Sequence, residues 1–304
     1  MKDLDTRIYK LLKQTRWTKD DLVNMLGISK NDLQQRLRKL EEKGVKLERS
    51  DGVVYVIDTL GETEYFVYSK AKANTSVQRF VLTSDWHAGS IQHDKEGLED
   101  CIKKATDMGA RFVLHSGDLS DGFGVYHGQL NNLSLWKVED QVGLLAKEIN
   151  KMGLNVYGIA GNHDYSYTQN TGVRVPYLLG KETKLFHDLG DFQADFVVDG
   201  VEIRLIHGAG GNAYAVSYPA QRYLRNLAEG TPDQVPDMLA IGHFHTNIVF
   251  DIYGCTVIHP GNFQKPNEFM IRRGIRGVRG CYFVEMQTYS GDIMRYESTF
   301  IKAR

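Results

Sequence analysis

The feature of this sequence that most restricts its fold is a series of apolar runs that end abruptly in polar residues. From residue 79 onward these strand-like runs alternate with helical stretches, of which 95–108 and 134–152 are the clearest. Such alternation predicts an α/β domain. The run N-V-Y-G-I-A shows the pattern most plainly, because it stops in glycine and is followed by Asn162, His163 and Asp164.

Four other runs end in the same way. Together the five ends read S-D-W-H, G-D-L-S-D, G-N-H-D, H-G and G-H-F-H. In open α/β sheets, ligands bind beyond the carboxyl ends of the strands, and glycine lets the backbone approach a ligand closely. The sequence therefore predicts a ligand site built from five strand ends.

The side chains at these ends are chemically matched. Carboxylate, imidazole and amide oxygen suit divalent ions such as Mn²⁺, Fe²⁺ and Zn²⁺, and the lack of cysteine among them argues against a structural zinc site. The candidate ligands are too many for one ion and suit two ions that share a bridging carboxylate. Two metals about 3.5–4 Å apart can clamp the attacking and leaving oxygens of a phosphoryl displacement.

The five motifs, in the order D-x-H, G-D-x-x-D, G-N-H-D, H-G and G-H-x-H, resemble those of the calcineurin-like metallophosphoesterase superfamily. The resemblance covers roughly residues 79–300. It implies an α/β (α+β) fold of two packed mixed β-sheets flanked by helices, an αββα sandwich.

The resemblance also implies a role for each residue of the site. One metal ion would be held by Asp85, His87 and His245, and Asp118 would bridge to the second ion. The second ion would be held by Asn162, His207 and His243. A hydroxide that bridges the metals would attack phosphorus, with His163 as the general acid and Asp164 as its orienting partner. We expect Mn²⁺, with Fe²⁺ or Zn²⁺ as alternatives, and we interpret Asp121 as support for the turn.

Residues 1–60 have a different pattern, which predicts three helices followed by a hairpin. Thr18 and Ser29, each followed three residues later by aspartate, start the second and third helices, Gly27 ends the second, and Gly44 ends the third. The S-D-G segment between V-K-L-E-R and V-V-Y-V-I predicts the hairpin. The order resembles a winged helix-turn-helix, in which the third helix enters the DNA major groove.

Outward-facing residues of this segment are candidates for nucleic-acid contact. They are Lys30, Asn31, Gln34, Gln35, Arg38 and Arg49. The segment carries 13 basic and 10 acidic residues, a net charge of only +3, so a protein-docking or dimerisation module is the alternative. Residues 61–78 are expected to be a linker and 79–304 the phosphoesterase domain.

A second set of candidate contacts lies in the phosphoesterase domain. Arg272 and Arg273 lie in a glycine-rich stretch and are candidates for phosphate contact, with a solvated loop as the alternative. The tyrosines Tyr126, Tyr165 and Tyr167 follow metal-bearing loops and are candidates for base stacking.

Composition adds weaker constraints. The net charge is −1, so attraction to a polyanion must be local. The three cysteines lack C-x-x-C spacing, and no run of about 18 apolar residues is present, which predicts a cytoplasmic protein without a membrane segment.

The motifs predict the reaction class more strongly than the substrate. Gly122-Phe123 and Asp164 depart from the Arg-Gly and Glu of the Ser/Thr protein phosphatase branch. Together with the N-terminal segment, this predicts a phosphodiesterase that acts on nucleic acid, a DNA nuclease. The alternatives are a nucleotide phosphodiesterase or phosphomonoesterase, in which the N-terminal segment makes a homodimer or docks a protein, and a ligand-sensing transcriptional regulator.

Overall fold

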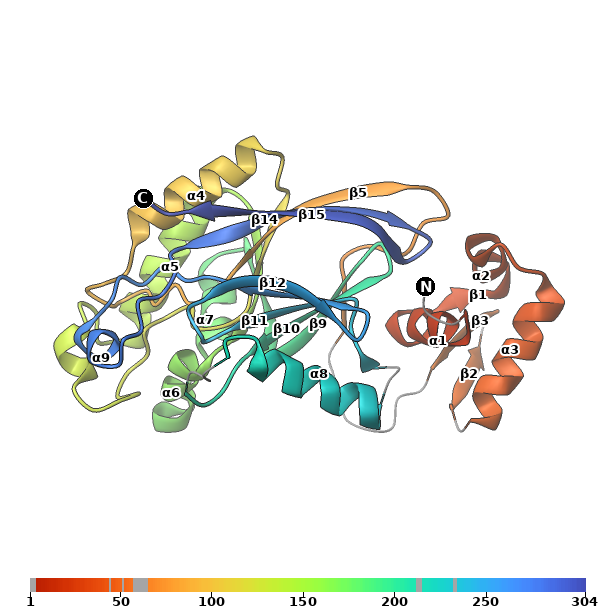
Figure 1. Ribbon diagram of the computed structural model, residues 1–304, viewed down its shortest axis with the longest axis horizontal. Helices are drawn as coiled ribbons and strands as arrows, with labels where there is room; N and C mark the ends of the chain where they lie inside the picture. The colour runs from red at the N-terminus through yellow and green to blue at the C-terminus, as the bar shows by residue number, and fades with distance from the viewer. Residues whose placement is uncertain (1–3, 44, 51, 57–64, 212–214, 232–233) are drawn as a thin grey trace.

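The computed structural model describes residues 4–43, 45–50, 52–56, 65–211, 215–231 and 234–304. Two six-stranded mixed β-sheets pack face to face and are flanked by helices, and a smaller module lies at one end (Figure 1). The predicted sandwich is confirmed. Within the described residues, no helix combines the length and apolar character needed to cross a bilayer.

The first large sheet carries the first three predicted strand ends. Its strand order is β15 (Asp292–Lys302), β14 (Gly280–Tyr289), β5 (Ser76–Thr83), β6 (Phe112–His115), β7 (Asn155–Ala160) and β8 (Phe186–Asp191). Strands β5 to β8 are parallel, and β14 is antiparallel to both of its neighbours. All four residues of β6 are buried, and Phe112, Val113 and Leu114 are apolar, as is usual for a parallel strand covered on both faces.

The second large sheet carries the other two strand ends. Its order is β12 (Asn247–Ile252), β13 (Cys255–Pro260), β11 (Met238–Gly242), β10 (Val201–His207), β9 (Gln193–Val198) and β4 (Tyr65–Val67). Strands β10, β11 and β13 are parallel, so His207 and Gly242 reach the same edge in register.

Part of the expected linker 61–78 belongs to the sheets. Strand β4 pairs in parallel with β9 at the sheet edge, and β5 begins at Ser76. The pairing partner of β4 lies more than 120 residues away, so local sequence does not reveal this short strand. Residues 61–64 and the expected boundary at residue 60 lie outside the described residues.

Three apolar layers hold the domain together. Between the sheets, Phe80 and Phe112 stack at 5.3 Å and are fully buried with Phe196. Outside the first sheet pack α4 (Lys95–Asp107), α5 (Val138–Met152), α6 (Asn162–Thr171) and α7 (Val175–Glu182); α8 (Tyr218–Gly230) packs outside the second. The helix expected at 95–108 is confirmed, and the one expected at 134–152 begins at Val138. Two short helices, η1 (Gln129–Asn132) and α9 (Glu268–Arg272), lie in loops.

The N-terminal module contains α1 (Leu4–Gln14), β1 (Trp17–Thr18), α2 (Lys19–Leu26), α3 (Lys30–Glu42), β2 (Leu47–Ser50) and β3 (Val53–Val56). The predicted caps are present: Thr18 Oγ1 accepts from the Asp21 amide at 3.1 Å, and Ser29 Oγ from the Asp32 amide at 3.0 Å. Gly27 ends α2 in the left-handed conformation (φ 65°). Gly44 and Asp51 lie outside the described residues, and assignment to the winged-helix class stays a prediction.

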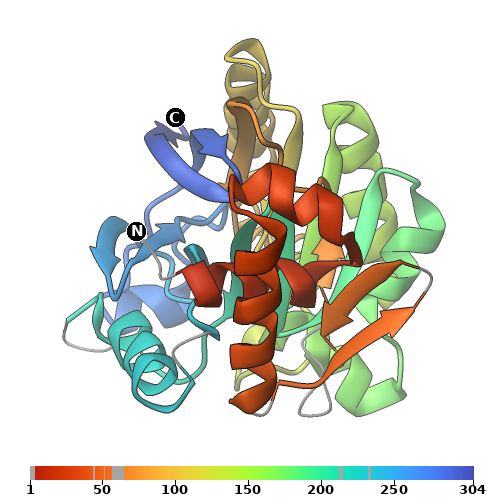
Figure 2. The same cartoon turned by 90° about the vertical axis from the view of Figure 1, so that its right-hand side faces the viewer.

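Helix α1 docks the module at the amino end of β10 through Lys10 and Gln14. In Figure 2 the module, in red and orange, lies in front of the phosphoesterase domain. Lys10 Nζ lies 3.7 Å from the Glu202 carboxylate, with both side chains buried, and Gln14 donates to the Gly200 carbonyl at 3.3 Å. Burial, opposed by Lys10, raises the pKa of Glu202 to about 7. His207 lies at the other end of β10, five residues or roughly 17 Å from Glu202 at the usual strand rise. The module therefore lies at the opposite end of the sheet from the predicted site.

Candidate metal centre

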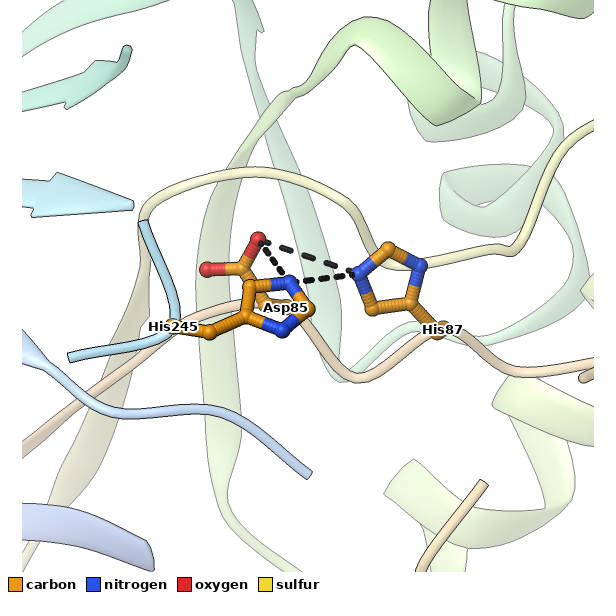
Figure 3. Close-up of side chains that lie close together, drawn as sticks. All are labelled: Asp85, His87 and His245. Atoms are coloured by element: carbon orange, nitrogen blue, oxygen red, sulfur yellow. Dashed lines mark hydrogen bonds and ion pairs between the residues drawn. The ribbon is translucent and has the colours of Figure 1, made fainter. Parts of the chain in front are cut away.

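The first predicted metal site lies where β5 and β11 end. His87 Nε2 lies 3.1 Å from His245 Nε2, and Asp85 Oδ1 lies 3.4 Å from His245 Nε2 and 3.8 Å from His87 Nε2 (Figure 3). Two metal bonds of about 2.1 Å at tetrahedral to octahedral angles place ligand atoms about 3.0–3.5 Å apart. The spacing of the three ligand atoms therefore suits one ion.

The second predicted site adjoins the first. His207 Nε2 lies 3.2 Å from Asp118 Oδ2 and 3.1 Å from Asn162 Oδ1, which lies 2.9 Å from His243 Nδ1. Asp118 Oδ2 also lies 3.8 Å from His87 Nε2 in the first site. The structure thus brings all the predicted ligand residues together, with Asp118 between the two groups. Their assignment to two ions stays a prediction.

Three of the histidines are held through the ring nitrogen that faces away from the predicted ion. His87 Nδ1 lies 3.0 Å from Asp121 Oδ1, His207 Nδ1 2.9 Å from the Ser116 carbonyl, and His243 Nε2 2.7 Å from the Gly210 carbonyl. Because these oxygens accept hydrogen bonds, each outer nitrogen carries a proton, and in the neutral imidazole the inner nitrogen presents a lone pair to an ion. The tautomers therefore suit metal binding.

The backbone at the site is strained. Five ligand residues adopt the left-handed conformation, with φ between 52° and 82°: Asp85, His87, Asp118, His243 and His245. Each such non-glycine residue costs about 1–2 kcal/mol, and strain of this kind persists only where the surroundings enforce it. Gly161 is also required, because a Cβ there would collide with the Asp118 carboxylate. The fold thus holds these side chains in an unfavourable local conformation that makes them converge.

The charges of the site also suit cations. Burial raises the pKa of Asp118, but His207 and His163 lower it by more, so the net pKa lies well below its usual range. Burial likewise opposes ionisation of Asp85, which His245 favours, and the net pKa is lowered. The imidazoles beside these two fully buried carboxylates therefore favour their ionised form. Donor types, spacing, tautomers and charge together fit two divalent cations.

Metal binding is expected to strengthen as the pH rises. In the metal-free protein burial lowers the pKa of His207, but the Asp118 carboxylate raises it by more, to about 9. Below that pH an ion must displace this proton, so affinity at the second site should rise about tenfold per pH unit between about pH 6 and 8. Calorimetric titration with Zn²⁺ in buffers of different ionisation enthalpy measures both the affinity and the protons released. An affinity independent of pH would contradict the protonated state of His207.

The imidazole of His163 is oriented by a residue other than the expected one. Its Nδ1 donates to the backbone carbonyl of Asp121 at 2.7 Å, and its amide donates to Asp118 Oδ1 at 2.8 Å. The carboxylate of Asp164 instead accepts from the amides of Gly161, Leu119 and Ser120 at 2.8–3.1 Å and from the Ser120 hydroxyl. The expectation that Asp164 orients His163 is corrected, because the helical turn that starts at Asn162 directs this carboxylate toward the backbone.

We therefore expect Asp164→Ala to act on stability first. The substitution leaves three buried amides without their acceptor, and it should lower the free energy of unfolding by about 3 kcal/mol. Urea denaturation measures the loss, and Asp107→Ala, at an exposed position on α4, is the control. A variant of unchanged stability with an altered pH profile of activity would instead restore the orienting role.

A cavity of about 990 Å³ opens over the metal centre. Some of the residues predicted to contact the substrate line this cavity, and others do not. Arg273 and Tyr126 line it, whereas Arg272 is exposed and paired with Glu268. Tyr165 packs on Phe192 at 4.9 Å, and Tyr167 is buried, with its hydroxyl donating to the Trp136 carbonyl at 2.9 Å.

The site contains one unpredicted contact and two unpredicted residues. Asp121, interpreted from sequence as support for the turn, also holds His87, and Phe269 and Asn267 line the cavity. The second aspartate of G-D-x-x-D was a signal for Asp121. No local sequence pattern indicates Phe269 or Asn267. They lie at the cavity because the 262–279 segment passes beside the metal centre.

The predicted nucleic-acid residues of the module lie together on its surface. Lys30, Asn31, Gln34 and Arg49 line a groove of about 580 Å³ between α3 and the hairpin. Two further residues are exposed on α3: Gln35 and Arg38. Lys30 pairs with Asp20 and Arg49 with Glu41, each at 2.7 Å, so both cations already have anionic partners. Nucleic-acid contact by this surface stays a prediction.

Comparisons with known proteins identify relatives of this chain. Two curated proteins, both named DNA polymerase II small subunit, are similar to this chain. The one from Methanothermobacter thermautotrophicus is 24% identical over 204 residues, 57% of this chain and 42% of that protein. The one from Thermoplasma acidophilum is 24% identical over 223 residues, 61% of this chain and 45% of that protein. The matched segment thus spans less than half the length of these relatives.

A solved structure of an archaeal phosphodiesterase aligns with 74% of this chain and 100% of its own, with 16% identity and a TM-score of 0.43. The profile of the calcineurin-like phosphoesterase superfamily domain matches residues 79–273. Because this match covers well over half of the sequence and includes all five motifs, the chain belongs to the calcineurin-like phosphoesterase superfamily.

Proposed function

We propose that this protein is a metal-dependent phosphodiesterase that acts on nucleic acid. The observation that carries the proposal is the pair of adjoining ligand groups that share Asp118 at the base of a large cavity. The first ion would be held by Asp85, His87 and His245. The second would be held by Asn162, His207 and His243, with Asp118 between them. Bound there, the two ions would polarise the phosphoryl oxygens and lower the pKa of a water molecule toward neutrality, which supplies the nucleophile.

The remaining requirement is a proton for the leaving oxygen, and His163 is suited to deliver it. Burial lowers the pKa of His163, but Asp118 and Asp121 raise it above its usual value, so the acid form is favoured. With Nδ1 held by the Asp121 carbonyl, a second proton resides on Nε2, which lies on the cavity side, 4.0 Å from Asp118 Oδ2. As the bond from phosphorus to the leaving oxygen breaks, Nε2 gives its proton to that oxygen.

Two observations favour a nucleic acid as the substrate. The curated relatives bear the name of a DNA polymerase subunit. The cavity also combines aromatic side chains with the cation of Arg273 beside the predicted metals, a combination that suits bases and phosphates.

The position of the N-terminal module limits how it can assist. Figure 1 shows α1 to α3 at one end of the long axis and α6 and α9 at the other. A nucleic acid that contacts both α3 and the metal centre must extend well beyond the roughly 17 Å that separates the ends of β10. The alternative is a small nucleotide substrate, with the module used for docking or dimerisation. This alternative is favoured by the separation and by the ion pairs that already engage Lys30 and Arg49.

A matrix of metals and substrates tests the proposal. With Mn²⁺, Fe²⁺ or Zn²⁺ the purified chain should hydrolyse bis(p-nitrophenyl) phosphate and at least one polynucleotide among single-stranded DNA, double-stranded DNA and RNA. A chelator should abolish both activities. Cleavage of the p-nitrophenyl diester and of small nucleotides, with every polynucleotide left intact, would overturn the nucleic-acid part and favour the alternative. Absence of any metal-dependent hydrolysis would overturn the proposal as a whole.

A further inference from the structure

Aromatic side chains lead outward from His163 along one wall of the cavity. The ring of Tyr126 lies 6.3 Å from the His163 ring, and the ring of Phe269 lies 4.7 Å from that of Tyr126 at an interplanar angle of 30°. The guanidinium of Arg273 lies 4.2 Å above the Phe269 ring. We call Tyr126, Phe269 and Arg273 the aromatic wall. All three line the cavity, so a molecule bound at the metal centre can reach them.

The wall is built by two segments far apart in the sequence. Tyr126 belongs to the loop after β6, and Phe269 and Arg273 belong to α9 and its end. Asn267 joins them, since its Nδ2 donates to the Tyr126 hydroxyl at 3.1 Å while its Oδ1 caps α9 by accepting from the Met270 amide at 2.9 Å. Asn267 is 3% exposed, so the wall is held from behind and presents a fixed surface to the cavity.

The position of the wall identifies which part of a substrate it meets. His163 is the group that protonates the leaving oxygen, so the wall that begins beside it follows the leaving group rather than the attacking water. Because Tyr126 and Arg273 both lie over the ring of Phe269, Phe269 is the middle layer that supports them. A tyrosine ring near His163, followed by a supported guanidinium, suits a planar base followed by a phosphate, because bases stack on aromatic rings and guanidinium forks bind phosphate.

We propose that the aromatic wall is a nucleobase subsite for the nucleoside on the leaving side of the scissile phosphodiester, with Arg273 contacting the next phosphate. This inference rests on the proposed function, since it takes its orientation from His163. It makes Tyr126 and Phe269 determinants of substrate specificity. A substrate without a base on the leaving side loses this contact and is used less well.

Matched dinucleotides test the subsite. Thymidylyl-thymidine is compared with two analogues in which the 5′ or the 3′ base is replaced by hydrogen, and the product that keeps the phosphate identifies the leaving side. We expect removal of the leaving-side base to lower kcat/KM about tenfold, and removal of the other base to have little effect. Phe269→Leu should reproduce the tenfold loss on the complete dinucleotide and have no further effect on the leaving-side abasic analogue.

Controls separate this subsite from a merely structural role. Phe269→Leu should leave the melting temperature unchanged. Tyr177→Leu, at an exposed aromatic residue outside the cavity that also has a cation over its ring, should behave like the wild type with every substrate. Equal losses on complete and abasic dinucleotides would overturn the subsite. If neither dinucleotides nor polynucleotides are cleaved while methyl p-nitrophenyl phosphate is, the nuclease proposal fails, and binding of 2-aminopurine riboside 5′-monophosphate decides the subsite separately. The affinity is measured by fluorescence quenching. An affinity that is about tenfold weaker in Phe269→Leu supports the subsite, and equal affinities of the two proteins overturn it.

Discussion

Replacing Asp118 with asparagine is expected to lower phosphodiester hydrolysis by about 10³-fold or more, because it removes a negative charge that lies between the two ligand groups. Asp118 Oδ2 lies 3.2 Å from His207 Nε2 and 3.8 Å from His87 Nε2. Asparagine has nearly the same shape and still accepts from the His163 amide, so the fold should be kept. The loss should therefore appear in metal content as well as in turnover.

Asp107→Asn is the matched control for this substitution. Asp107 is an exposed aspartate near the end of α4, paired with Lys103 at 2.7 Å, and its replacement changes the net charge by the same amount. Its kcat, metal content and melting temperature should equal those of the wild type. An Asp118→Asn protein that keeps more than about a tenth of wild-type activity would contradict a shared, bridging carboxylate.

Replacing His163 with alanine is expected to separate proton transfer from metal binding. In the proposed assignment His163 is not a ligand of either ion, although it lies within reach of one together with His87 and Asp121, so the metal content should be unchanged. Turnover of a nucleic-acid diester should fall about 10²- to 10⁴-fold, the usual contribution of a general acid. Bis(p-nitrophenyl) phosphate should lose far less, because p-nitrophenolate departs without needing a proton.

The control for this substitution is His127→Ala. His127 is an exposed histidine in the loop that also carries Tyr126, and its replacement should be silent with both substrates. If His163→Ala lowers the hydrolysis of both substrates equally, then His163 acts by holding Asp118 or the metals, and the assignment of the general acid is wrong.

The arrangement of the ligand residues could be predicted from sequence because each motif joins a buried strand to a sharp turn. Asp85, Asp118 and His243 directly follow strands, and the carboxyl ends of parallel strands meet at one edge of a sheet. Which of these residues would share an ion was implied by the resemblance to the superfamily. The capped starts of α2 and α3 were predictable for the same reason, since Thr18 and Ser29 act on amides three residues ahead.

Features decided by contacts between distant segments could not be predicted. The direction of the Asp164 carboxylate depends on where α6 begins relative to Leu119 and Ser120. The pairing of β4 with β9 and the meeting of Phe269 with Tyr126 join segments more than 120 residues apart. Helix α6 has little amphipathic character because its first turn carries the G-N-H-D residues, so its sequence resembles a loop.

The most direct test of the account is the number of metal ions bound by each half of the centre. After loading with Mn²⁺ and removal of the excess, elemental analysis of the wild type should give two equivalents per chain. His245→Ala and His207→Ala should each retain one equivalent, since each removes a ligand from only one group. A wild type that binds a single ion, or hydrolysis that survives complete removal of metal, would contradict a shared two-metal centre at these strand ends.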